Sequence, residues 1–387
     1  MAEEQDLRRW RLVLGGDDAA GTGATLTGAD REIDAALTAL YDPKGGGRRG
    51  GGLGSSSPYV AKWLGTIRDH FPRSAVQLLQ RDAIERLDLQ KLLLEPEMLA
   101  EVEPDVHLAA TLLSLAKMLP EAAKEPARRV VRKVVAEVEE KLRAELEAAV
   151  RGAVSRARRS RRPRPADIDW DRTIRANLKN WSPEHRVVVP ETLIGYARRR
   201  RHARLRDVIL CVDQSGSMAS SVVYAGIFGA VLASIRSVGT KIVVFDTAVV
   251  DLTHLASDPV DLLFGTQLGG GTDIHRALTY CEGLVERPEQ TTMVLITDLF
   301  EGGDRRAMIR KIASLVDSGV NLICLAALND DGAPSYDGRN AGDLAQMGVP
   351  TFACTPELFP DLMAAALERK DIHAWAARHE VPLIRGE

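Results

Sequence analysis

Short apolar runs alternate with amphipathic stretches along the second half of the chain. The run from Val208 to Val212 is unbroken and rich in β-branched residues, which is typical of a strand buried on both faces. The other predicted strands are 241–245, 249–252, 291–297, 320–326 and 350–353. The predicted helices are 222–235, 259–264, 273–285, 306–316, 341–347 and 358–367. Strands that alternate with helices at these lengths predict a parallel α/β sheet, with 249–252 as an antiparallel edge strand.

The first part of the chain has helical periodicity instead, and we predict a mostly helical N-terminal region over residues 1–162. Its last element is one long helix from Glu125 to about Arg162, along which valine or leucine recurs every four residues between Val130 and Val154. A stripe with this spacing drifts around the helix. The drift favours packing on the chain's own helical region, and a coiled coil with a partner or a second copy is the alternative.

A glycine-rich stretch at 45–57 interrupts the helical region. It lacks the Gly-Lys-Ser/Thr sequence that a phosphate-binding loop requires, and this excludes a nucleotide site of that type. We predict a flexible loop from the composition, and a loop that closes on a partner is the alternative.

Positive charge is concentrated in residues 151–206, which contain 17 Lys and Arg against 5 Asp and Glu. We assign 163–202 as a basic linker or docking segment. Three interpretations compete: a solvated linker, a docking surface for an acidic protein, and a surface for nucleic-acid phosphates. Aromatic residues do not interleave the arginine runs, which weakens a single-strand-binding interpretation. Ile174, Leu178 and Trp181 share one helical face, so we expect them to pack on another domain.

Composition narrows the class of protein further. An apolar content of 45%, a charged content of 27% and a net charge of −3 give no general bias toward nucleic acid or membrane. No apolar run approaches about 18 residues, so we expect no membrane span, and the acidic N-terminus lacks a secretion signal. The four cysteines fit no zinc motif, so we expect free, mostly buried thiols and a cytoplasmic protein.

Hydroxyl and carboxylate side chains gather where predicted strands end. Asp213, Ser215 and Ser217 follow the most apolar run at alternate positions. Asp298 follows a later predicted strand, and Thr272 follows three glycines just before a predicted helix. Ligands of open α/β sheets bind beyond the carboxyl ends of the strands. Hard oxygen donors at this place suit Mg²⁺ or another hard divalent ion.

Other roles compete for the residues around these motifs. Ser217, and Thr272 or Asp273, would serve only as helix caps if they held no metal. A hydrolase would need a base that activates a serine, and His275 is the candidate for that base. Glu301 is either an outer-sphere group of a metal site or a plain loop carboxylate.

The three motifs, in this order, resemble the metal-ion-dependent adhesion site of von Willebrand factor A (VWA) domains. The resemblance covers residues 203–370 and implies a doubly wound, mostly parallel sheet flanked by helices. Residues 371–387 form a C-terminal extension that we expect to fold back on the helical region through Trp375. The resemblance implies protein binding without turnover, so we expect no enzyme; an acidic side chain of a partner would fill the open metal position. The implied metal ligands are Asp213, Ser215, Ser217, Thr272 and Asp298, and the implied cofactor is Mg²⁺, with Mn²⁺ or Ca²⁺ as substitutes.

The layout of the chain supports a second resemblance. A helical region and an arginine-rich approach directly precede the sequence Arg206 to Met218, as in bacterial VWA proteins of the CoxE-like group, which includes ViaA- and YehP-like proteins. This resemblance implies a MoxR-type AAA+ ATPase as partner and an adaptor role that links the ATPase to a client protein. The alternative is a nucleic-acid-associated protein that uses residues 151–206.

Overall fold

The computed structural model describes residues 11–12, 26, 28–41, 57–86, 93–157, 159–160, 165, 168–196, 206–266, 270–328 and 335–384. The chain divides into two compact units, residues 1–136 and 137–387. Most of the glycine-rich stretch and of the two arginine-rich runs lies outside the described residues, so the loop predicted at 45–57 stays a prediction. The same holds for the domain limits predicted at residues 162 and 202.

The first unit consists of helices, which confirms the predicted helical region. These helices are α2 (Ala29–Tyr41), α3 (Ser57–His70), α4 (Arg73–Arg86), α5 (Pro96–Glu101), α6 (Val106–Ser114) and the first part of α7 (Glu121–Ala157). Pro96 starts α5, and the Asp105 side chain caps α6 by accepting a 2.6 Å hydrogen bond from the Leu108 amide. The Trp63 indole of α3 donates to the Ala36 carbonyl of α2 at 2.9 Å. Polar anchors thus fix the helices around an apolar interior.

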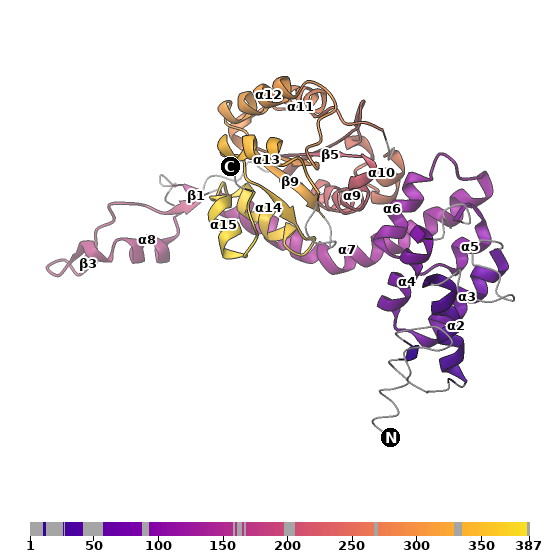
Figure 1. Ribbon diagram of the computed structural model, residues 1–387. Coiled ribbons are helices and arrows are strands. Elements are labelled where there is room, and N and C mark those ends of the chain that lie inside the picture. Colours follow the sequence, from indigo (N-terminus) through magenta and orange to yellow (C-terminus); the bar gives the residue numbers. More distant parts are fainter. Residues whose placement is uncertain are drawn as a thin grey trace. The chain divides into compact units, whose positions relative to one another are not determined.

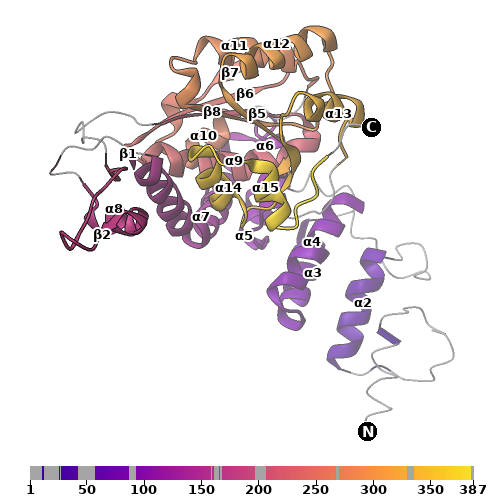
Figure 2. The ribbon, with the colours of Figure 1, turned by 90° about the vertical axis from the view of Figure 1, so that its left-hand side faces the viewer.

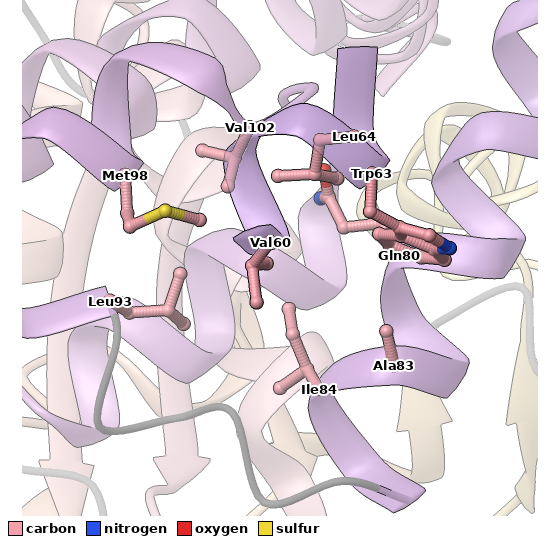
Figure 3. Close-up of a pocket in the computed structure, with 9 residues that line it drawn as sticks. All are labelled: Val60, Trp63, Leu64, Gln80, Ala83, Ile84, Leu93, Met98 and Val102. Atoms are coloured by element: carbon pink, nitrogen blue, oxygen red, sulfur yellow. The ribbon is translucent and has the colours of Figure 1, made fainter. Parts of the chain in front are cut away.

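This interior contains a small cavity of about 20 Å³, room for one water molecule (Figure 3). Gln80 supplies the polar side chain of the lining, and its amide already exchanges hydrogen bonds of 3.0 and 2.8 Å with the Glu103 backbone. The cavity is therefore a packing gap and not a binding site. Its lining residues are Val60, Trp63, Leu64, Gln80, Ala83, Ile84, Leu93, Met98 and Val102.

The predicted long helix is α7, which starts one turn earlier than expected, so that Pro126 lies inside it. The boundary between the compact units falls within this helix, after Ala136. Apolar residues on both sides of the boundary are buried, Val130 and Val134 before it and Leu146 and Val150 after it. Burial within the chain accounts for the stripe without a coiled coil. The prediction that the whole helix packs on the helical region is wrong, because the part of α7 after Ala136 belongs to the second unit.

The second unit is built on a six-stranded sheet (Figure 1). Its strands are β5 (Arg206–Asp213), β6 (Val238–Phe245), β7 (Val249–Asp251), β8 (Thr291–Ile296), β9 (Asn321–Leu328) and β10 (Thr351–Cys354). They lie in the order β10-β9-β8-β5-β6-β7, and all neighbours are parallel except β6 and β7. This confirms the predicted doubly wound sheet and its antiparallel edge. The strand order reverses between β5 and β8, which makes the gap beyond their carboxyl ends the topological switch point.

Helices cover both faces of this sheet, as Figures 1 and 2 show. The helices are α9 (Ala219–Ser234), α10 (Pro259–Gly265), α11 (Ile274–Gly283), α12 (Arg305–Asp317), α13 (Gly338–Gln346) and α14 (Phe359–Leu367). One layer contains α11 and α12, whose buried residues Leu278 and Ile312 join a core with Cys211 of β5. The other contains α9 and α14, whose rings Phe228 and Phe359 stack with centroids 4.5 Å apart.

The crossover helix α9 is unusually apolar. Among the described residues, the stretch Gly216–Ser234 is long and apolar enough to cross a membrane, with a mean hydropathy of 1.5, but 72% of it is buried in the protein. Every position from Ser221 to Leu232 is buried, because α9 packs between the sheet and other helices. Its composition is that of a core helix.

A small group of short elements precedes the sheet. They are β1 (Arg159–Ser160), α8 (Trp170–Ala176), a 3-10 turn (Leu178–Asn180), β2 (Trp181–Ser182), β3 (Val187–Val188) and β4 (Gly195–Tyr196). The expectation that Ile174, Leu178 and Trp181 pack on another domain is wrong, since these side chains are 43%, 58% and 49% exposed. The spacing was compatible with one face, but it could not show whether anything covers that face.

The C-terminal extension also differs from its prediction. It forms α15 (Ile372–Arg378), and Trp375 packs on the second unit instead of the helical region. The indole contacts Phe352 of β10 with ring centroids 5.8 Å apart and donates to Asp361 of α14 at 2.8 Å. The cysteine prediction is confirmed, because all four thiols are free and buried.

Candidate metal centre

The first motif lies at the carboxyl end of the central strand β5. Asp213 is the last residue of β5 and pairs in register with Phe245 of β6. Its carboxylate accepts a hydrogen bond of 2.9 Å from the Ser215 amide, which turns the chain sharply after the strand. A 3-10 turn over Gly216–Met218 then leads into α9. The turn brings the two serine hydroxyls together, with Ser215 Oγ 3.2 Å from Ser217 Oγ.

The third motif meets the first across the switch point. Asp298 follows β8, the neighbour of β5. The Ser217 hydroxyl donates a hydrogen bond of 2.6 Å to Asp298 Oδ2, although the two residues are 81 positions apart. The structure therefore brings four of the predicted site residues into one cluster: Asp213, Ser215, Ser217 and Asp298.

Thr297 belongs to this cluster and was not singled out in the sequence. Its side chain is fully buried and donates a hydrogen bond of 2.7 Å to Asp213 Oδ2. The Thr297 hydroxyl oxygen also accepts a hydrogen bond of 3.2 Å from the Leu299 amide. A polar residue at the end of an otherwise apolar strand run was the available signal, because a buried hydroxyl needs a partner.

The second motif contacts the loop that follows β8, and in the described residues no hydrogen bond joins Thr272 to the other four predicted site residues. The Gly302 amide donates to the Thr272 carbonyl at 2.8 Å, and a Cβ at Gly302 would meet that same oxygen at 2.8 Å. The Glu301 carboxylate accepts from the Ile274 amide at 2.7 Å. Glu301 therefore ties the two loops together, which goes beyond the role of a plain loop carboxylate. Thr272 itself is 9% exposed.

The capping alternative applies to one residue of the second motif and to none of the first. Asp273 caps α11, since it accepts from the Arg276 amide at 2.8 Å. By contrast, α9 begins after Met218 without a side-chain cap, and the Ser217 hydroxyl bonds Asp298 instead. In the described part of the chain, no hydrogen bond joins the His275 ring to either serine of the first motif, so the structure gives no support to His275 as the base of a hydrolase.

Burial dominates the electrostatics of the cluster. The pKa of Asp213 is raised to about 6, chiefly by burial and also by the negative charge of Asp298, although hydrogen bonds from Thr297 and Ser215 act in the opposite direction. Asp213 is 0% and Asp298 5% exposed. Among the described residues, no lysine or arginine forms an ion pair with either one. Two buried carboxylates without a compensating charge are costly, and a bound cation would relieve that cost.

The chemistry of the donors fits a hard divalent ion. The set contains two carboxylates and three hydroxyls, all of them oxygen donors, which suits Mg²⁺ better than a softer metal. The part of the chain that the structure describes contains no group of three or more His, Cys, Asp and Glu placed to hold a metal, as a zinc site would require.

The loop after Asp298 is held in an unusual conformation. Leu299 has a positive φ of 63°, although its side chain is fully buried. The Leu299 carbonyl accepts a hydrogen bond of 2.8 Å from the Asn340 side chain, and the Asp298 carbonyl accepts one of 2.9 Å from the Asp337 amide. Contacts with the start of α13 thus maintain a strained backbone beside the candidate centre.

Comparison with known proteins gives a family match and a relative that aligns along nearly the whole chain. Residues 142–363 match the family described as VWA domain containing CoxE-like protein. Over 371 residues the chain is 36% identical to the Uncharacterized protein YehP of Escherichia coli (strain K12). The alignment covers 94% of this chain and 97% of YehP.

Solved structures give a weaker likeness. One is an aerotolerance-related membrane protein from Bacteroides fragilis, with 16% identity and a TM-score of 0.35 over 42% of this chain and 99% of that chain. Another is a von Willebrand factor type A structure from Catenulispora acidiphila, with 14% identity and a TM-score of 0.32 over 42% of each chain. The family match spans more than half of the chain, and the relative aligns along nearly all of it. This chain belongs to the CoxE-like family of VWA-domain proteins.

Proposed function

We propose that the protein is a metal-dependent protein-interaction module, in which the cluster at the switch point holds Mg²⁺ or a similar ion. The hydrogen bond between Ser217 and Asp298 carries the proposal, since it gathers the first and third motifs around two buried carboxylates. Family membership supports it, because VWA domains typically bind a divalent metal and act as interaction modules. The metal ligands would be Asp213, Ser215, Ser217, Thr272 and Asp298.

Each part of the centre has its own task in this proposal. The bound ion would supply a position at which an acidic side chain of the partner protein completes the ligand set. Thr297 orients the Asp213 carboxylate through its 2.7 Å hydrogen bond. Glu301 holds the loop that contains Gly302 against the start of α11, and so fixes the backbone of Thr272.

We further propose that the partner is a MoxR-type AAA+ ATPase and that the protein links this ATPase to a client. The proposal rests on membership of the CoxE-like family. Four free, buried cysteines are typical of a reducing compartment, and we place the protein in the cytoplasm on that basis. Binding without turnover fits the site, where no histidine among the described residues forms a hydrogen bond with either serine.

The test is a pull-down from native lysate with wild type and Asp213→Ala, each in Mg²⁺ and in EDTA. The proposal predicts that the ATPase or a client accompanies wild type in Mg²⁺ and is depleted from the other three samples. Equal recovery of the same proteins in all four samples would contradict it. The nucleic-acid alternative predicts binding that is sensitive to salt and insensitive to EDTA.

A further inference from the structure

Leu299, which follows the predicted metal ligand Asp298, has a backbone conformation that leucine rarely adopts. Its φ of 63° lies in the left-handed region, where the Cβ of an L residue crowds the next carbonyl oxygen. The side chain is nevertheless fully buried in the apolar core of the sheet unit. A strained residue of this kind persists only where its surroundings hold it. If its peptide groups were free, Leu299 would relax to a negative φ and the Asp298 carboxylate would move with the backbone.

Hydrogen bonds fix the peptide groups on both sides of Leu299. The Asp298 carbonyl accepts from the Asp337 amide at 2.9 Å. The Leu299 carbonyl accepts from Asn340 Nδ2 at 2.8 Å, and the Leu299 amide donates to the Thr297 hydroxyl at 3.2 Å. Asp337 and Asn340 form the start of α13, where the Asp337 side chain accepts from the Asn340 amide at 2.9 Å. The first turn of α13 thus holds two successive carbonyls of the loop.

Asn340 is the polar member of the buried side of α13, where the other buried residues are small or apolar. It is 1% exposed, so its amide group needs partners inside the protein. Its nitrogen donates to the Leu299 carbonyl, and its oxygen accepts from Arg305 Nε of α12 at 2.6 Å. Arg305 also pairs with Asp343 of α13. A buried network in which the oxygen and the nitrogen both have partners specifies one orientation of the amide.

This network connects α12 and α13 to the candidate metal centre without supplying a metal ligand. The two helices are neighbours (Figure 2), and the network continues from Arg305 through Asn340 to Leu299. It ends at the backbone that holds Asp298, whose carboxylate accepts from the Ser217 hydroxyl. An apolar side chain at position 340 would pack in the same core, but it could not hold the Leu299 carbonyl. The amide of Asn340 therefore serves the loop and not the packing of α13.

We propose that Asn340 is a positioning residue for the metal centre, which keeps Leu299 at positive φ and thereby holds Asp298 where the ion binds. Arg305 fixes the amide of Asn340 in the orientation that this role requires. Metal affinity then depends on the contact between α12 and α13, outside the ligand set itself. The inference rests on the proposed function, because it concerns the same metal centre.

The test compares full-length wild type with Asn340→Ala, Arg305→Met and Asn321→Ala. Asn340→Ala removes the amide, whereas Arg305→Met removes the group that fixes the amide and keeps an apolar stem. Asn321→Ala is the matched control. Asn321 donates to the Ala366 carbonyl at 3.0 Å, but it lies at the amino end of β9, opposite the candidate centre. Circular dichroism verifies that all four proteins are folded.

Two measurements are made on each protein. Amide hydrogen exchange of the metal-free protein reports on the order of the loop 298–303, and calorimetric titration gives the Mg²⁺ affinity. For Asn340→Ala we expect faster exchange in this loop and an Mg²⁺ affinity that is lower by about tenfold or more, as for lost outer contacts of metal sites. Arg305→Met should change both in the same direction by less. Asn321→Ala should match wild type in both, although it also loses a hydrogen bond.

The failure of this inference differs from the failure of the proposed function. If wild type binds Mg²⁺ and Asn340→Ala binds it equally well, the role of Asn340 is contradicted and the metal centre is not. An equal loss of affinity in Asn321→Ala would also overturn the inference, because the effect would then be one of general stability. If wild type binds no Mg²⁺, the proposed function fails and this inference fails with it. Should Asn340→Ala not fold, Arg305→Met decides, since Arg305 lies at the partly exposed end of the network.

Discussion

Ser217 donates a hydrogen bond of 2.6 Å to the carboxylate of Asp298, and this contact joins the ends of two strands that are far apart in sequence. The strands β5 and β8 are neighbours because the sheet reverses its order between them. The contact places a hydroxyl and a carboxylate beside Asp213, whose charge is also buried. The predictions below follow from this concentration of buried oxygen donors.

The raised pKa of Asp213 makes the stability of the metal-free protein depend on pH. Its pKa is about 6 in the folded protein and about 3.8 when unfolded, so the folded state binds the proton more tightly. The stabilising contribution is therefore complete below about pH 4 and is lost as the pH rises to about 6. The loss amounts to about 3 kcal/mol at most.

Urea unfolding of metal-free wild type and Asp213→Asn between pH 4 and 7 measures this contribution. The asparagine variant cannot titrate at this position, so the difference between the two proteins isolates Asp213 from other carboxylates. We expect wild type to lose stability relative to the variant as the pH rises. Parallel profiles would show that the Asp213 pKa is ordinary.

Thr297→Val removes the hydroxyl that donates to Asp213 and leaves the shape of the side chain nearly unchanged. We expect a loss of about 1–3 kcal/mol of stability, because a buried carboxylate loses a donor. The pKa of Asp213 should rise further, since this hydrogen bond lowers it. The midpoint of the pH profile described above should therefore move upward.

Thr291→Val is the matched control for Thr297→Val. Thr291, the first residue of β8, is about as buried as Thr297, but its hydroxyl donates to the Arg287 carbonyl at 2.8 Å. This variant should lose stability without moving the pH midpoint. A shift of the same size in both variants would mean that the Thr297 hydroxyl has no specific effect on Asp213.

Gly302→Ala tests the link between the loop after β8 and the second motif. The added Cβ would lie 2.8 Å from the Thr272 carbonyl, so one of the two backbones must move. We expect calorimetry to show metal affinity reduced by about tenfold or more, as for displaced outer contacts of metal sites. Gly283→Ala meets no atom within 4 Å and should bind metal as wild type does. Unchanged affinity in Gly302→Ala would separate this loop from the metal centre.

Periodicity predicted the sheet unit well, because its strands are apolar on both faces and the helices α11, α12 and α13 are amphipathic. The antiparallel edge strand was predicted at 249–252, after a turn at Asp246, and β7 covers Val249–Asp251. The metal-ligand motifs could be recognised in the sequence because they follow predicted strands, and the carboxyl ends of parallel strands lie at one edge of the sheet. Thr297 escaped notice, since its role depends on a contact with Asp213, 84 positions away.

Two other errors share one cause. The predicted surroundings of Trp375 and of Ile174, Leu178 and Trp181 were wrong. The spacing of residues along the chain shows which side chains share a face, but it does not show which other surface packs against that face. Trp375 found its partners on β10 and α14, where an acceptor at Asp361 was available. Ile174 and Leu178 stay exposed because the polar residues Thr173 and Asn177 are the buried ones in the segment 168–196.

The most direct test of the central claim is a calorimetric titration of Mg²⁺ into metal-free wild type, Asp213→Asn and Asp304→Asn. Asp304 is the exposed N-cap of α12, and asparagine preserves its capping role. We predict one bound ion per chain in wild type and Asp304→Asn, and affinity at least about a hundredfold weaker in Asp213→Asn. No binding by wild type, or equal binding by all three proteins, would contradict the account.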